Sequence, residues 1–153
     1  MYTFQHHQEL CLSIEQCWEF FSNPANLKVL TPPSLRMDIE EKDNSPKIYP
    51  GMILSHTIRP FLNIPLQWIS EITHILPFQY FIDEQLYGPY KFWHHEHRFR
   101  PSTKGVEVSD TIHYMMPYGY LGQAAHRLGI KQKIEEAFVF RKNTLEELFG
   151  SST

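Results

Sequence analysis

Two neighbouring segments, GPYKFWHHEHRFRP (residues 88–101) and GVEVSDTIHYMMP (residues 105–117), alternate aromatic, histidine and aliphatic side chains with polar ones. Alternation with a period of two is typical of β-strands, and the short turn between them makes the strands antiparallel neighbours. A long amphipathic helix is expected directly afterwards, from Tyr120 to Phe149, with an apolar stripe that starts with Leu121 and Leu128 and continues through Phe138 and Leu145. A twisted sheet that grips one long helix leaves a hollow between the two layers, so these residues predict a binding cavity.

The rest of the chain is expected to extend the same sheet within a single domain, residues 1–153. Ser13 and Gln16 form a capping-box pattern, which predicts a helix over Ile14–Ser22. Pro24 is expected to open a second short helix through Leu30, and Gly129 to kink the long one. Strands are predicted over Tyr2–Leu12, Leu35–Glu41, Met52–Arg59, Leu66–Leu76, Phe78–Tyr87, Tyr90–Arg100 and Val106–Met116. The expected fold class is α+β: a seven-stranded antiparallel sheet with two short helices after the first strand and a long C-terminal helix.

Composition excludes several classes of function. The net charge is −3 without any long basic run, which argues against nucleic-acid binding because phosphates need clustered Lys and Arg. No apolar run approaches the ~20 residues that span a bilayer, and the N-terminus lacks the pattern of a secretory signal. Cys11 and Cys17 fit neither a metal site nor a disulfide framework. The chain is therefore expected to be cytoplasmic, without integral membrane association.

The run His94-His95-Glu96-His97 invites a metal-site interpretation, because imidazole and carboxylate ligate zinc and iron. In a strand, His95 and His97 share one face, and Asp110 on the next strand is the candidate third ligand. The favoured interpretation is that these imidazoles are hydrogen-bonded to Asp110, to Tyr or to the backbone. No metal and no cofactor are therefore expected.

Arg141 is out of place on the apolar stripe of the long helix. Either its guanidinium reaches into the cavity to meet an acidic ligand group or Asp110, or its stem lies on the sheet with the charge at the rim. Rim placement is the commoner arrangement for a long cationic side chain. No glycine-rich phosphate loop, GxSxG elbow or HExxH motif is present, so no catalytic residue is assigned.

The segments GPYKFWHHEHRFRP, VSDTIHYMMPYGYLG (residues 108–122) and FVFRKNTLEELF (residues 138–149), with NPANL (residues 23–27), resemble the SRPBCC (START-like) superfamily. The resemblance covers nearly the whole chain. It implies the helix-grip fold of the birch-pollen allergen and polyketide cyclases, and a cavity between the concave sheet and the helix Tyr120–Phe149. The superfamily includes lipid carriers, hormone receptors, aromatases and coenzyme Q-binding proteins, so the resemblance specifies a fold and no single function.

The leading hypothesis is a protein that binds or carries a hydrophobic, partly polar small molecule. The alternatives are a cyclase- or dehydratase-type enzyme, in which His95, His97, Asp110 or Arg141 would move protons, and an interaction module that uses the apolar turn Phe61–Ile64. A homodimer is compatible with these patterns. Alternation does not fix which strand face points inward. The candidate ligand-binding residues are Trp68, Phe81, Trp93, His95, His97, Phe99, Asp110, Tyr114, Phe138 and Arg141.

Overall fold

The computed structural model describes residues 1–40, 45–60 and 63–150. The elements follow in the order β1 (Tyr2–Leu10), α1 (Ile14–Phe21), η1 (Pro24–Leu27), η2 (Pro33–Leu35), β2 (Asp38–Glu40), β3 (Ile53–Ile58), β4 (Leu66–Leu76), β5 (Tyr80–Tyr87), β6 (Phe92–Ser102), β7 (Gly105–Met115), α2 (Tyr120–Ala125), η3 (His126–Ile130) and α3 (Lys131–Phe149). Here η1 and η2 are 3-10 turns, and η3 is a wide π-helical turn.

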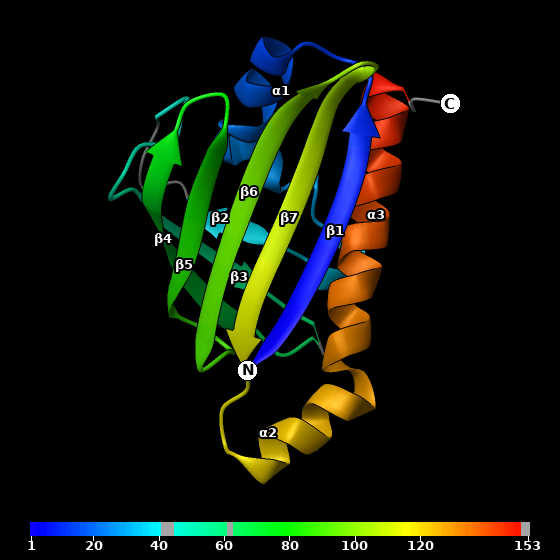
Figure 1. Cartoon of the computed structure of the whole chain (residues 1–153). Coiled ribbons are helices and arrows are strands. Elements are labelled where there is room, and N and C mark those ends of the chain that lie inside the picture. Colours follow the sequence, from blue (N-terminus) through cyan, green and yellow to red (C-terminus); the bar gives the residue numbers. More distant parts are fainter. Residues whose placement is uncertain (41–44, 61–62, 151–153) are drawn as a thin grey trace.

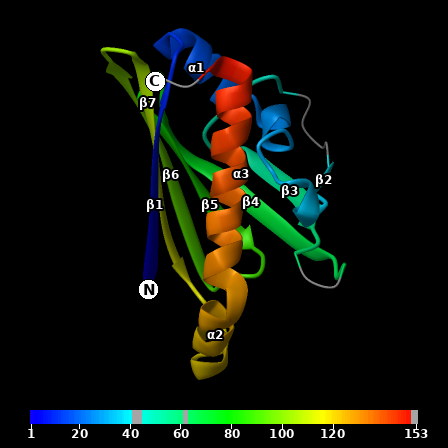
Figure 2. The same ribbon diagram turned by 90° about the vertical axis from the view of Figure 1, so that its right-hand side faces the viewer.

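The strands form one antiparallel sheet of seven in the order β1-β7-β6-β5-β4-β3-β2. The sheet is strongly curved, and α3 runs along its concave side while α1 closes one end (Figures 1 and 2). This confirms the predicted α+β fold class, the number of strands and the helix-grip arrangement. Among the described residues, no helix combines the length and the apolar character needed to cross a bilayer.

The capping box that begins α1 is confirmed. The backbone N–H of Gln16 donates to Oγ of Ser13 at 3.2 Å, and the backbone N–H of Ser13 donates to Oε1 of Gln16 at 3.0 Å. After α1, the side chain of Asn23 accepts from the N–H of Ala25, but the expected helix through Leu30 is only the 3-10 turn η1. The strand predicted to begin at Leu35 begins at Asp38, because η2 and a left-handed residue, Arg36 (φ 44°), precede it.

The long C-terminal helix is kinked at Gly129, as predicted, since this residue has non-helical dihedral angles inside η3. The part of the helix that precedes the kink, α2, projects past the end of the sheet (Figure 1). The expectation that Leu121 and Leu128 continue the buried stripe is therefore wrong: they are 77% and 86% exposed. Among the described side chains of the stripe, the buried ones lie on α3, at Ile134, Phe138 and Leu145.

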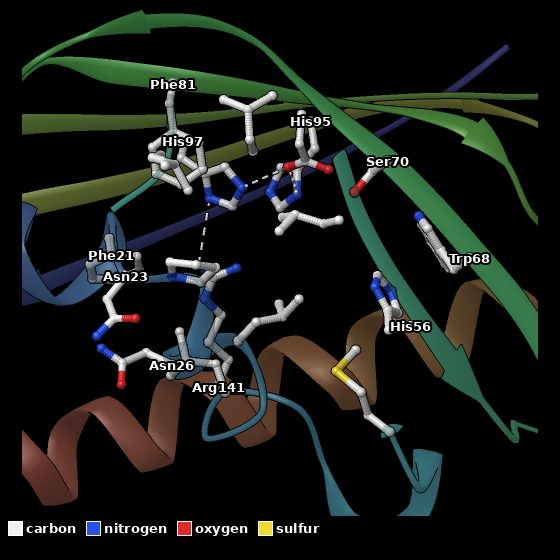
Figure 3. Close-up of a pocket in the computed structure, with 18 of the residues that line it drawn as sticks. Phe21, Asn23, Asn26, His56, Trp68, Ser70, Phe81, His95, His97 and Arg141 are labelled. Carbon is white, nitrogen blue, oxygen red and sulfur yellow. Dashed lines mark hydrogen bonds and ion pairs between the residues drawn. The ribbon is translucent and has the colours of Figure 1, made fainter. Parts of the chain in front are cut away.

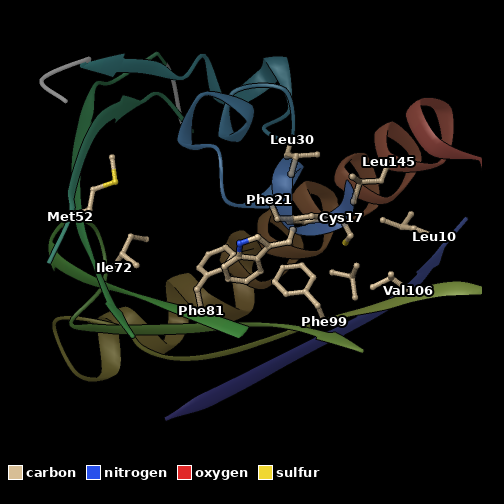
Figure 4. Packing of buried hydrophobic residues seen from close by; sticks show 12 residues of the cluster. Leu10, Cys17, Phe21, Leu30, Met52, Ile72, Phe81, Phe99, Val106 and Leu145 are labelled. Atoms are coloured by element: carbon tan, nitrogen blue, oxygen red, sulfur yellow. The ribbon is translucent and has the colours of Figure 1, made fainter. Parts of the chain in front are cut away.

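The inner face of the sheet is the one that carries Trp93, His95, His97 and Phe99 of β6, which are all buried. At the α1 end, Phe99 contacts the rings of Trp18, Phe21 and Phe81, and Figure 4 shows Phe21, Phe81 and Phe99 packed between α1 and the sheet. At the other end Trp93, Ile112, Tyr114, Ile134 and Phe138 form a second buried cluster. A cavity and a polar cluster lie between the two apolar groups.

The two thiols should differ sharply in reactivity. Cys17 belongs to α1 and is fully buried, and burial raises its pKa to about 12, whereas Cys11 is exposed. At pH 8 the thiolate fraction of Cys17 is then on the order of 10⁻⁴, and the thiolate is the reactive species. We expect iodoacetamide to modify Cys11 alone in the folded protein and both thiols after unfolding, as measured by peptide mass spectrometry. Rapid stoichiometric labelling of Cys17 in the folded protein would contradict this.

Candidate functional site

A cavity of about 220 Å³ lies between α3, the inner face of the sheet and the segment that follows α1. Its walls are largely apolar, with Phe21, Leu30, Ile58 and Ile72 among them. The polar side chains are not spread evenly. Figure 3 shows His95, His97 and Arg141 meeting toward one end of the cavity, with Trp68 and His56 toward the other.

The structure brings six of the ten candidate residues into this cavity wall. They are Trp68, Phe81, Trp93, His95, His97 and Arg141. Phe138 lines a second hollow of about 200 Å³ that shares the side chains of Trp68 and Trp93 with the first. Phe99, Asp110 and Tyr114 are buried and line neither hollow; Tyr114 instead hydrogen-bonds Nε2 of His126 through its hydroxyl at 2.8 Å.

Asp110 lies beneath the two histidines and contacts both. Nε2 of His95 donates to Oδ1 of Asp110 at 3.0 Å, and Nδ1 of His97 lies 2.8 Å from the same oxygen. This proximity follows from the antiparallel register of β6 and β7, which sets His97 directly opposite Asp110. The side chain of Asp110 is only 2% exposed, so these imidazoles provide contacts that water cannot.

Asp83 of β5 completes the cluster, although it is not among the ten candidate residues predicted from the sequence. Nε2 of His97 donates to Oδ2 of Asp83 at 3.0 Å, and Nδ1 of His95 lies 3.5 Å from that oxygen. Unlike Asp110, Asp83 lines the cavity. The signal available in the sequence was the short connection at Gly88-Pro89, which makes residues 78–87 and 90–100 neighbours. The register of the two strands in the structure sets Asp83 opposite His95.

Arg141 reaches inward from α3, and its guanidinium is not at the rim. Nη1 lies 3.4 Å from Oδ1 of Asp110, and the guanidinium packs within 5.3 Å and 5.5 Å of the ring centres of Phe21 and Phe138. Its Nε is buried without a hydrogen-bond partner among the described residues. A buried donor of this kind is unfavourable unless an acceptor reaches it.

The charges of the cluster balance. Burial alone would raise the pKa of Asp110. The Arg141 guanidinium and the hydrogen bonds from His95 and His97 nevertheless hold this pKa well below its usual value. Burial likewise opposes ionisation of Asp83, but contacts with His97 and His95 lower its pKa. Two carboxylates therefore face Arg141 and one imidazolium.

His97 is the imidazolium of this arrangement. Burial alone would lower its pKa, but the hydrogen bonds to Asp110 and Asp83 raise it. The pKa of His95 is lowered by burial and by the neighbouring charge of His97, so His95 stays neutral beside it. The cluster is then neutral overall, which is the condition under which buried ions are tolerated.

His56 at the far end of the cavity should remain neutral well below the usual range for histidine. Burial lowers its pKa to about 4, partly opposed by the carboxylate of Asp83, and its ring stacks on Trp68 with centroids 5.8 Å apart. Between pH 6.5 and 4 the unfolded chain binds a proton here that the folded chain does not, so this residue makes the protein less stable as the pH falls. We expect its imidazole NMR signals to titrate near pH 4; a midpoint near 6.5 would contradict this.

Comparison with known proteins places the chain by its fold alone. No family model matches it, and no curated protein matches it. Protein CV1439 from Chromobacterium violaceum is similar over 98% of both chains with a TM-score of 0.73 and 12% identity. Protein Ms6760 from Mycobacterium smegmatis covers 99% of this chain and 91% of its own, with a TM-score of 0.70 and 16% identity.

The same arrangement occurs in Ara h 8.0201, which has a Bet v 1-like fold. This likeness covers 95% of this chain and 98% of that one, with a TM-score of 0.62 and 11% identity. Identities this low establish the class of architecture, a helix-grip fold like that of Ara h 8.0201, and no particular activity.

Proposed function

We infer that this protein binds a compact small molecule with a flat apolar body and a hydrogen-bonding group, in the cavity between α3 and the sheet. The observation that carries this inference is the asymmetric lining: largely apolar walls, with His95, His97 and Arg141 gathered toward one end (Figure 3) and Asp83 beside the two histidines. The polar side chains of His56 and Ser70 lie away from this group. Few polar groups in an otherwise apolar pocket are typical of small-molecule sites, because they orient the ligand.

Two features limit the chemistry of the ligand. A volume of about 220 Å³ is below the roughly 300–1,000 Å³ of drug-sized pockets but above the ~150 Å³ in which a cavity accepts benzene. The Nε of Arg141, which is buried without a hydrogen-bond partner in the part of the chain that the structure describes, favours a ligand that carries an acceptor such as a hydroxyl, carbonyl or carboxylate oxygen. A one- or two-ring aromatic molecule with such an oxygen meets both requirements.

The fold supports a carrier as the physiological context. We include the chain in the SRPBCC superfamily on the resemblance of its sequence segments, and the helix-grip architecture agrees with that assignment. The free thiols of Cys11 and Cys17 are compatible with action in the reducing cytoplasm.

The test is a thermal-shift and native mass-spectrometry screen of one- and two-ring aromatic alcohols, ketones and carboxylates. We expect at least one compound to bind with 1:1 stoichiometry, to raise the melting temperature and to change the fluorescence of Trp68 or Trp93 in the wall. Aromatic hydrocarbons without an oxygen should bind more weakly. If no compound of either kind binds, the inference fails.

A matched pair of variants tells cavity binding from surface binding. Ser70 of β4 is buried and lines the cavity, so Ser70→Phe should fill the space and abolish binding of the best compound. Gln67 of the same strand is exposed, and Gln67→Phe should leave binding unchanged. Binding that survives Ser70→Phe in a folded protein would place the ligand elsewhere.

The second candidate function is acid–base catalysis of the cyclase or dehydratase type. The observation that favours it is that His95 and His97 line the cavity instead of facing solvent, so that a bound molecule would meet imidazoles oriented by carboxylates. Conversion of a bound compound, lost in His95→Gln while binding persists, would identify an enzyme.

The third candidate function is an interaction module that uses the apolar turn Phe61–Ile64. Phe61 and Leu62 of this turn lie outside the described residues, and Ile64 is 55% exposed.

A further inference from the structure

Both nitrogens of each central histidine have a defined neighbour. One nitrogen of each ring, Nε2 of His95 and Nδ1 of His97, is directed at Oδ1 of Asp110, at 3.0 Å and 2.8 Å. The other nitrogen of each ring is directed at Oδ2 of Asp83, at 3.5 Å from His95 and 3.0 Å from His97. The two carboxylates thus lie on opposite sides of the imidazole pair, one beneath it and one at the cavity wall.

This arrangement concentrates electron-pair donors at one point. Without a metal ion, the proton on Nε2 of His97 occupies the position that faces Asp83. When that proton leaves, both rings are neutral, with one N–H donor and one lone pair each, and rings that donate to Asp110 present their lone pairs toward Asp83. Two lone pairs and a carboxylate oxygen then converge on the cavity side. Lone pairs and a carboxylate oxygen that face one another repel, so a positively charged group must lie between them. Either a proton or a metal ion can take this position.

The distances fit a metal ion. In a tetrahedral site with Zn–N and Zn–O bonds of about 2.0–2.1 Å, neighbouring ligand atoms lie roughly 3.3 Å apart. The observed separations from Asp83 are 3.0 Å and 3.5 Å, and ligand atoms of Asp83, His95 and His97 all lie within 4.8 Å of one another. All three residues line the cavity, which leaves the remaining coordination position open to it.

The surroundings also fit a metal site. Histidines that ligate metals commonly donate their second N–H to a carboxylate, which fixes the tautomer and the ring orientation. Asp110 provides that carboxylate for both rings, and Arg141, 3.4 Å from it, balances its charge. The Asp110 side chain is shielded from the cavity by the two rings, so it orients the ligands without competing for the ion.

We propose that Asp83, His95 and His97 bind one divalent first-row transition-metal ion at the wall of the cavity, with Asp110 as the carboxylate that orients both histidines. Two imidazoles and one carboxylate with an open position are a donor set that suits Zn²⁺ or Fe²⁺. This site differs from the one that the sequence suggested, in which Asp110 was the candidate third ligand. It does not depend on whether the cavity also carries an organic molecule.

The test uses the full chain after treatment with a chelator, with Zn²⁺ and Co²⁺ as the probes. Calorimetry with Zn²⁺ should show saturable uptake of one equivalent. One equivalent of Co²⁺ should give the intense visible absorption of a site with few ligands and shift the NMR signals of two imidazole rings. If Co²⁺ leaves His95 and His97 unaffected in the unmodified protein, the proposal is wrong, whatever the variants do.

Asp110→Asn changes a residue that orients the ligands and should weaken Zn²⁺ binding by about 10–100-fold. Asp83→Asn removes the carboxylate ligand itself with little change of shape, so it should weaken Zn²⁺ binding more than Asp110→Asn does. His94→Asn is the matched control: His94 also contacts a carboxylate, Glu84 at 2.6 Å, but lies on the opposite face of β6. It should bind Zn²⁺ like the unmodified protein. Equal affinity in Asp83→Asn, or loss of binding in His94→Asn, would overturn the proposal.

Discussion

Replacing Phe99 with alanine is expected to lower the free energy of unfolding by about 3–5 kcal/mol, the range for a fully buried phenylalanine. Phe99 is 2% exposed, and its ring contacts Trp18, Phe21 and Phe81 at centroid distances of 5.7, 5.2 and 6.0 Å. The loss combines the transfer free energy of the ring with the cost of the cavity that remains, because the three aromatic neighbours, two on α1 and one on β5, cannot all move inward.

Urea unfolding at pH 7 measures this loss, and the melting temperature should fall by roughly 10 °C for a domain of this length. Phe92→Ala is the control, since Phe92 lies on the same strand but is 37% exposed. Its effect should stay near 1 kcal/mol. Equal losses in the two variants would mean that the packing of α1 against β6 is not what stabilises this end of the molecule.

The same strand shows what local sequence signals can predict. Alternation along β6 places Trp93, His95, His97 and Phe99 on one face, and the turns on both sides make β5, β6 and β7 antiparallel neighbours, which the structure confirms. Period and turn chemistry are properties of a few adjacent residues, so one sequence is enough to read them. Which face is the inner one depends on the curvature of the whole sheet, and alternation alone does not contain that information.

The two errors of placement have physical causes that also lie beyond local patterns. Asp83 belongs to the cluster through its register with β6, and the pairing of β5 with β6 ends at Glu84 and His94, several residues from the turn at Gly88-Pro89. The position of the turn therefore does not fix the partner of each residue. Leu121 and Leu128 follow helical periodicity, but the kink at Gly129 directs α2 away from the sheet. An apolar stripe predicts burial only where a partner surface exists.

Replacing Arg141 with methionine should lower the free energy of unfolding of the metal-free protein by about 3 kcal/mol at pH 7. Removing one partner of a buried ion pair leaves the other charge uncompensated, which typically costs about 3–5 kcal/mol, and Asp110 keeps its contacts with His95 and His97. Methionine preserves most of the packing between Phe21 and Phe138, so the effect reports charge more than volume.

The loss should depend on pH in a defined direction. In the unmodified protein the Arg141 guanidinium helps to hold the pKa of Asp110 well below its usual value. A carboxyl group whose pKa is lowered in the folded protein stabilises the fold at pH values above its pKa in the unfolded chain, about 3.9 for Asp. This stabilisation is lost as the pH falls through the lower, folded value. Arg141→Met reduces this depression, so the difference between the two proteins should be full above pH 5 and should shrink below pH 4.

A double variant separates the ion pair from the rest of the cluster. Asp110→Asn combined with Arg141→Met removes both charges and should recover at least half of the stability lost in Arg141→Met alone, because the two residues are coupled directly. Lys142→Met changes the adjacent residue of α3, whose ammonium is half exposed 3.8 Å from Glu146, and should change stability by less than about 0.5 kcal/mol. If Arg141→Met behaved like Lys142→Met, the guanidinium of Arg141 would be solvated and would not compensate the charge of Asp110. Asp110 would then have only the histidines as partners. The positive charge that balances the two carboxylates beside the cavity would have to come from a second imidazolium.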